Sequence, residues 1–185
     1  MATNGFGQEL TRRNAVRAGV ALGAAAAIAR GTDAAFAQQA TPQAGADTTM
    51  RATLTLDGAL RMIEAARAKA TELNVPMVIV VVDDSGLLKA FVRMDGAGVG
   101  SIDLATGKAY TAAAFRTPTD QLAARAAQDP ARLATFTNSP QVRLLPGGLP
   151  IKIGDAVAGG LGAGGGTPDQ DLQVAQAGVA AVASA

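Results

Sequence analysis

The sequence predicts an α+β fold in which helices lie on an antiparallel sheet. The run Met77–Val82 (MVIVVV) is rich in β-branched residues and has no polar alternation, which is typical of a strand buried on both faces. Candidate strands follow one another across short turns, and such strands pair antiparallel. Strands and helices do not alternate along the chain as a doubly wound nucleotide-binding fold requires. The predicted order is α-β-β-α-α-β-β-(β)-α.

The first helix of this order is predicted over Leu54–Asn74, with Thr55 as its N-cap. Its apolar residues recur at steps of three and four, and we expect them to face the core: Leu56, Leu60, Ile63, Ala66, Ala70 and Leu73. The strand Met77–Val82 follows, and Asp83–Gly86 has the composition of a hairpin turn. A second strand is predicted over Leu87–Met94.

Three further helices are predicted in the middle of the chain. The first begins at Ser101, as a cap, and runs to about Phe115 with one face formed by Leu104, Lys108, Thr111 and Phe115. Thr117-Pro118 and Asp129-Pro130 each predict the start of a short helix, because a capping residue precedes a proline at the first helical position. Residues 141–164 are predicted to hold two or three short strands, and a last helix covers Asp169–Ala183.

The N-terminal residues have the layout of an export signal. Arg12-Arg13 precedes an apolar run of small residues, and Ala35-Phe36-Ala37 offers a cleavage site. This arrangement is typical of a bacterial twin-arginine signal peptide, although an amphipathic or disordered tail is the alternative. We therefore expect a signal peptide over 1–37, a flexible linker over 38–52 and one domain over 53–185. The expected location is periplasmic or secreted, with no membrane anchor after cleavage.

Composition excludes several kinds of chemistry. The chain has no Cys and no His, so a disulfide, a zinc-thiolate site, a cysteine nucleophile and a His-based triad are all excluded. Aromatic residues make up only 3% and the net charge is +1. Neither a stacking platform for bases nor a basic patch is present, so we expect no nucleic-acid partner.

The glycine-rich stretch Gly159–Asp171 (GGLGAGGGTPDQD) poses the question of phosphate binding. A phosphate-binding loop requires Lys followed by Ser or Thr after its last glycine, whereas here Thr167-Pro168-Asp169 follows Gly166. Asp169 and Asp171 would also repel a phosphate at the helix start. We interpret the stretch as a structural turn with Thr167 as N-cap, whose glycines allow close approach to another subunit or a flat ligand.

An ordered series of short motifs resembles the GlcG/HbpS-like family of small haem-binding proteins, whose domain is also fused to PduO-type corrinoid adenosyltransferases. The resemblance runs from about Leu54 to Ala183. It rests on Ala65–Lys69, Pro76 with VIVVVDDSG, Arg93–Ala97, Ser101, Ala105 through Ala112, Pro146-Gly147-Gly148 with Ile151, and Gly162 through Asp171. It implies a five-stranded antiparallel sheet flanked by helices, assembly into homo-oligomers, and a role in haem sensing, storage or degradation.

Two features depart from the family pattern. IKIGDAVA at Ile151–Ala158 replaces a Gly-Gly-x-Pro turn, and the chain lacks the histidine that most often holds haem iron. The resemblance places the haem contact around Lys108–Thr111, between this helix and a neighbouring subunit. Tyr110, the only tyrosine, is the candidate iron ligand. The other candidate contacts are Lys108 and Arg116 for propionates, Thr111, and Phe115 and Met94 for a porphyrin face.

Each candidate also has a purely structural interpretation. Tyr110 would then be a partly buried core residue, and Lys108 and Arg116 solvated charges. We interpret Met62 and Met77 as core residues. Asp83, Asp84 and Asp95 are adjacent to turns, and we interpret them as turn residues rather than cation ligands.

Three functions remain open on the sequence. The first is an exported haem or tetrapyrrole carrier, buffer or sensor accessory, with haem as its cofactor and a sensor or enzyme as a further partner. The second is a small-molecule enzyme, for haem breakdown or a hydroxy-acid step, in which Asp, Lys or Tyr would do acid–base work. The third is an oligomeric interaction module with a vestigial site.

Overall fold

A computed structural model describes residues 49–183. The predicted signal peptide and most of the predicted linker lie outside these residues. The described part contains α2 (Leu56–Glu72), β1 (Val78–Asp83), β2 (Leu88–Arg93), α3 (Ser101–Phe115), α4 (Thr119–Ala126), α5 (Pro130–Thr137), β3 (Gly148–Ile153), β4 (Ala156–Gly164) and α6 (Pro168–Ala183). None of its helices is long and apolar enough to cross a membrane.

The strands form one antiparallel sheet in the order β2-β1-β4-β3. The α+β class is confirmed, but the described residues hold four strands and the expected five is wrong. Residues 141–164 supply β3 and β4 alone. Leu54, just before α2, makes one backbone hydrogen bond to Ala158 (3.2 Å) and does not extend into a strand.

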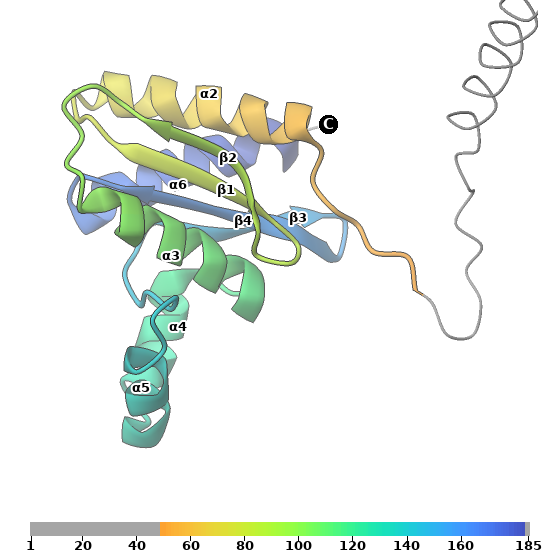
Figure 1. Cartoon of the computed structure of the whole chain (residues 1–185), viewed down its shortest axis with the longest axis vertical. Helices are drawn as coiled ribbons and strands as arrows, with labels where there is room; N and C mark the ends of the chain where they lie inside the picture. Colours follow the sequence, from red (N-terminus) through yellow and green to blue (C-terminus); the bar gives the residue numbers. More distant parts are fainter. Residues whose placement is uncertain (1–48, 184–185) are drawn as a thin grey trace, which may run out of the picture. The chain divides into compact units, whose positions relative to one another are not determined.

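Helices cover both faces of the sheet, as Figure 1 shows. On one face, α2 and α6 pack through Met62, Ile63 and Val174 against Ile79 and Val81 of β1. On the other face, α3 packs through alanines against the alternate β1 residues Val78, Val80 and Val82. Since β1 also lies between β2 and β4, all five residues Val78–Val82 are buried, which confirms the interpretation of the β-branched run.

The buried face of α2 differs from the prediction. Leu56 and Leu60 are 54% and 48% exposed, whereas Met62, Ile63, Ala66 and Ala70 are buried. The helix lies against α6 through small residues: a Cβ added to Gly178 would lie 3.2 Å from the Cβ of Ala66. This close helix pair leaves the two leucines outside the core.

Helix starts agree with the capping predictions in three places and differ in two. Thr55 accepts from Gly58 N–H (3.2 Å), Asp129 accepts from the amides of α5, and Thr167 accepts from Gln170 N–H (3.4 Å). Ser101 does not cap α3, whose N-cap is Gly100 with no side-chain hydrogen bond. Thr117 does not cap α4 either, because its hydroxyl donates to Phe115 O (2.9 Å) and Pro118 occupies the cap position.

Candidate ligand-binding site

Helix α3 lies unusually close to β4, and glycines make this possible. Gly160, Gly162 and Gly164 occupy alternate positions of β4 on the side that α3 covers. A Cβ on Gly160 would overlap the carbonyl oxygen of Ala109, and one on Gly162 that of Ala105. The interpretation of the whole glycine stretch as a turn is therefore wrong: only Gly165 and Gly166 form the turn before α6. The neighbour that approaches the glycines is α3 of the same chain.

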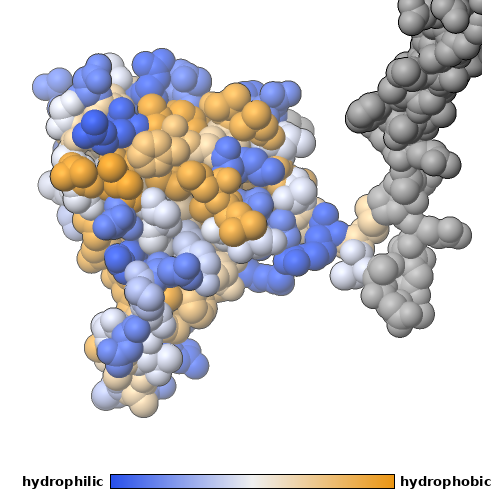
Figure 2. Space-filling model, in the orientation of Figure 1, coloured by the Kyte–Doolittle hydropathy of each residue, from blue (hydrophilic) through white to orange (hydrophobic). Residues whose placement is uncertain are grey.

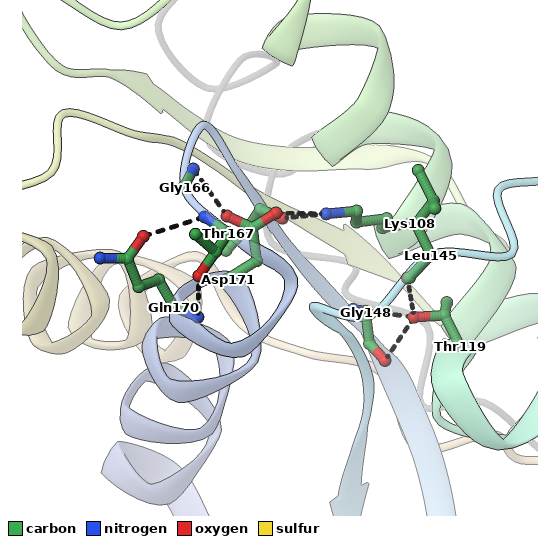
Figure 3. A network of polar contacts seen from close by, with 9 residues as sticks. Lys108, Thr119, Leu145, Gly148, Gly166, Thr167, Gln170 and Asp171 are labelled. Atoms are coloured by element: carbon green, nitrogen blue, oxygen red, sulfur yellow. Dashed lines mark hydrogen bonds and ion pairs between the residues drawn. The ribbon is translucent and has the colours of Figure 1, made fainter.

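A buried ion pair ties α3 to the start of α6 (Figure 3). Lys108 Nζ lies 2.6 Å from Asp171 Oδ2, and the two side chains are 3% and 7% exposed. Lys108 also donates to Ala163 O (2.9 Å), and Asp171 Oδ1 accepts from Gly166 N–H (3.0 Å). Lys108 is therefore not the solvated charge that one interpretation expected.

Burial dominates the electrostatics of this pair. The pKa of Asp171 is raised above its ordinary value because burial penalises the carboxylate, although Lys108 and the Gly166 amide lower it. The pair lines a pocket of about 260 Å³. Its other walls are Ser101, Leu104, Leu145, Pro146, Gly165, Gly166 and Pro168.

Tyr110 points away from this pair into a different pocket of about 350 Å³. Its ring lies against Gly86 in the β1–β2 turn, where an added Cβ would come within 2.8 Å of the ring. The pocket is also lined by Asp103, Thr106, Gly107 and Arg143. The Tyr110 side chain is half-buried, and no described residue forms a hydrogen bond with its hydroxyl.

Thr111 supports this pocket from behind. It is fully buried, and its hydroxyl donates to Gly107 O (2.6 Å) and accepts from Arg143 N–H (2.9 Å). Both hydrogen-bonding roles of the hydroxyl are thus used to hold the Arg143 segment against α3. Thr111 has no surface on which to contact a ligand directly.

Phe115 and Arg116 lie at the end of α3. The Phe115 ring meets Phe136 of α5 edge to face, with centroids 5.0 Å apart, in a third pocket of about 560 Å³. Arg125 and Arg132 also line this pocket. Arg116 ends the helix in the left-handed conformation (φ 53°) and is exposed.

The structure does not bring the six predicted residues together. Met94 packs against the core cluster between the sheet and α2, on the face opposite α3. Lys108, Tyr110 and Phe115 line three different pockets around α3. A single site that uses both Met94 and Phe115 is therefore incompatible with this chain alone.

Sequence reasoning missed Asp171 and Arg143 as site residues. Asp171 was noted as an acidic residue at a helix start and as the end of a family motif, and nothing local links it to Lys108, 63 positions away. Arg143 lies in an irregular segment without a periodic pattern. The alternate spacing of Gly160, Gly162 and Gly164 was the available signal that a helix crosses the strand there.

The carboxylates near the hairpin are turn residues, as predicted. Asp83 Oδ1 accepts from the amides of Ser85 (2.9 Å) and Leu87 (3.0 Å). Asp84 pairs with Arg51 (3.0 Å). Within the described residues no group of three acidic side chains is arranged to hold a metal ion.

Comparison with known families identifies the chain. Residues 54–180 match the family model described as "Haem degrading protein HbpS-like", and the chain belongs to this family. The resemblance found in the sequence is thereby confirmed.

Among individual proteins, the chain is 41% identical over 127 residues to an uncharacterized 15.0 kDa protein of the dhaT-dhaS intergenic region of Citrobacter freundii. That match covers 68% of this chain and 89% of the relative. The chain is also 36% identical over 124 residues to the corrinoid adenosyltransferase PduO of the same organism, but this covers only 37% of that longer protein against 66% of this chain.

Solved structures share the fold. The crystal structure of HbpS superposes with a TM-score of 0.70 at 34% identity, covering 77% of this chain and 99% of HbpS. The Klebsiella pneumoniae protein ORFY gives the same TM-score at 32% identity, with the same two coverages. The PduOC:Heme complex superposes with a TM-score of 0.65 at 31% identity, covering 70% of this chain and 95% of that one.

Proposed function

We propose that this protein binds haem or a related tetrapyrrole, as a carrier or buffer. Its family is described as haem-degrading, and one similar structure is a haem complex. The observation that carries the proposal is the Tyr110 pocket, which Arg143 also lines and in which no described residue forms a hydrogen bond with the Tyr110 hydroxyl.

The residues of this pocket fit a haem group. Tyrosine is a known haem ligand, and no described residue occupies the Tyr110 hydroxyl that would serve as one. Arg143 Nη1 is held by Pro140 O (2.7 Å) and Val142 O (2.9 Å), which fixes the guanidinium and leaves its other donors for a propionate. When bound, haem would supply its iron chemistry. The chain would supply Tyr110 as a ligand of the iron, Arg143 as a partner for a propionate, and a partly apolar pocket wall.

A haemin titration followed by its Soret band tests the proposal. We expect saturable binding by the full chain, and about tenfold or greater weakening in Tyr110→Phe, corresponding to about 1.4 kcal/mol. Arg143→Ala should weaken binding less, and Thr111→Ala only indirectly, by loosening the Arg143 segment. Met94→Leu is the matched control, and its affinity should be unchanged because Met94 packs on the other face of the sheet.

Two outcomes would contradict this assignment. If Tyr110→Phe binds haemin as the wild type does, Tyr110 is not the iron ligand. If Met94→Leu weakens binding instead, the haem lies elsewhere. A spectrum of free haemin with the wild type would reject haem binding itself.

We also propose export through the twin-arginine route and assembly with further copies of the chain. Export is supported by Arg12-Arg13 and the Ala35-Phe36-Ala37 cleavage pattern. Replacing both arginines with lysine should retain the precursor inside the cell, as fractionation would show. A role in sensing or storage would then follow from binding outside the cytoplasm.

Assembly is supported by an edge of the sheet with which no other described strand pairs. β2 is an edge strand, and Leu88 and Phe91 on it are 63% and 42% exposed. Leu56 and Leu60 of the neighbouring α2 are also exposed, and Figure 2 shows hydrophobic surface running over these two elements. An exposed apolar edge strand is a template for pairing with another chain.

Haem degradation is a second candidate function, favoured by the description of the family. Lys108 and Asp171, a buried ion pair that lines a pocket, would be the candidate acid–base pair, but this pocket is a different one from that of Tyr110. Loss of the Soret band with formation of an open tetrapyrrole, under a reductant and oxygen, would favour degradation over storage.

A further inference from the structure

We propose that the pocket floored by Lys108 and Asp171 binds the carboxylate of a small aliphatic acid, separately from the Tyr110 pocket. The proposal does not depend on haem binding, because these pockets lie on different sides of α3.

The ammonium of Lys108 has an unused donor. A lysine carries three N–H groups, and Lys108 uses two of them, on Asp171 and Ala163 O. No described residue accepts the third, although the side chain is 3% exposed and lines the pocket. A buried donor without an acceptor is costly, so a ligand oxygen at this point would be favoured.

The pair is not explained by stability alone. A buried ion pair gains little over well-packed apolar residues, because desolvation opposes the attraction of the charges. Here the pair is buried and at the same time lines a pocket. Its position is therefore that of a recognition element.

The rest of the pocket selects the ligand class. Ser101 marks the start of α3, a helix of 15 residues without a side-chain cap, and its N-terminal amides favour an anion. Asp103 in the same turn opposes this effect, but it lines the Tyr110 pocket and not this one. Leu104, Leu145, Pro146 and Pro168 form apolar walls. At about 260 Å³ the pocket is smaller than those of drug-sized ligands, which start at about 300 Å³. A short aliphatic carboxylate matches this charge, polarity and size.

In this geometry the two charged residues have opposite effects on the binding of a carboxylate. Lys108 attracts the ligand, whereas the carboxylate of Asp171 repels it and occupies the ammonium. Removing Asp171 alone should therefore strengthen binding, and removing both charges should abolish it. If the ion pair had only a structural role, butyrate binding would be lost alike on removal of Asp171 alone and on removal of both charges.

Ligand-observed NMR with sodium butyrate, and with butyramide as the neutral counterpart, tests the proposal on the full chain. We expect saturable binding of butyrate and not of butyramide. Asp171→Asn should bind butyrate roughly tenfold more tightly, equivalent to about 1.4 kcal/mol. The double variant Lys108→Met/Asp171→Asn should not bind, and Lys152→Met, an exposed lysine on β3, should bind as the wild type does.

Several results would overturn the proposal. These are no saturable butyrate binding by the wild type, equal binding of butyramide, or binding retained in the double variant. The double variant contains no unpaired buried charge, so it keeps the test valid even if Asp171→Asn fails to fold. In a competition with stoichiometric haemin, we expect butyrate to remain bound. Displacement of butyrate would instead assign the pocket to a porphyrin propionate and reject a separate site.

Discussion

Gly160 and Gly162 are the residues on which the position of α3 most directly depends. Each faces a backbone carbonyl of α3 where no Cβ fits. Backbone atoms cannot rotate aside as a flexible side chain can. The close contact of helix and strand therefore requires glycine at these positions.

Gly162→Ala should accordingly destabilise the domain strongly. Overpacking typically costs about 1–3 kcal/mol, and this overlap with backbone belongs at or above the upper end. Chemical denaturation would measure the free energy of unfolding. Gly100→Ala is the matched control, since a Cβ there meets nothing within 4 Å, and it should change stability by less than about 0.5 kcal/mol. Equal effects would mean that α3 can move away from the sheet.

Asp171 should make the free energy of unfolding increase as the pH falls, which is opposite to the usual effect of a carboxylate. Its raised pKa means that the folded state holds the proton more tightly than the unfolded state does. The wild type should therefore gain stability relative to Asp171→Asn as the pH falls through the folded pKa toward the ordinary value of 3.8. Urea unfolding of both proteins across this range measures the difference. A relative loss of stability on acidification would show that attraction by Lys108 outweighs burial.

Among the elements, α5 is the least firmly attached part of the described chain. None of its residues is buried. Its described ties are the ring contact of Phe136 with Phe115 and the cap formed by Asp129. Elements with so little buried surface open at low free energy.

The cap of α5 should therefore determine its order. Asp129 Oδ1 accepts from the amides of Ala131 and Arg132, both at 3.1 Å. Asp129→Ala should cost about 1 kcal/mol of helix stability and raise amide exchange in α5 alone. Hydrogen exchange with mass spectrometry would detect this, with Asp155→Ala in the β3–β4 turn as the control. Faster exchange in β1 as well would contradict the independence of α5.

At the scale of the whole molecule, the edge strand β2 predicts how copies of the chain assemble. Phe91 is 42% exposed on this edge strand, where it pairs with Val80 and so lies on the face of the sheet that α3 covers. Phe91→Lys should shift the protein toward monomers, because a charge on an edge strand opposes pairing with another chain. Analytical ultracentrifugation would measure the mass. Leu133→Lys, on the exposed part of α5, should leave the assembly unchanged, and an unchanged Phe91→Lys assembly would place the interface elsewhere.

The sequence by itself determined the fold class and most element positions. Local signals suffice for these: the β-branched run of β1, the Asp83–Gly86 turn, and the caps Thr55, Asp129 and Thr167 act within a few residues. The family series was likewise readable, because it consists of short motifs in a fixed order.

Only the tertiary structure decided which residues meet. The pairing of Lys108 with Asp171, the turning of Tyr110 toward Gly86, and the placement of Met94 on the opposite face depend on how α3 crosses the sheet. The glycines of β4 appeared as a turn because glycine is common in turns, whereas here it makes room for a helix. The number of strands and the exposure of Leu56 and Leu60 depend in the same way on packing between elements far apart in the chain, which no local pattern encodes.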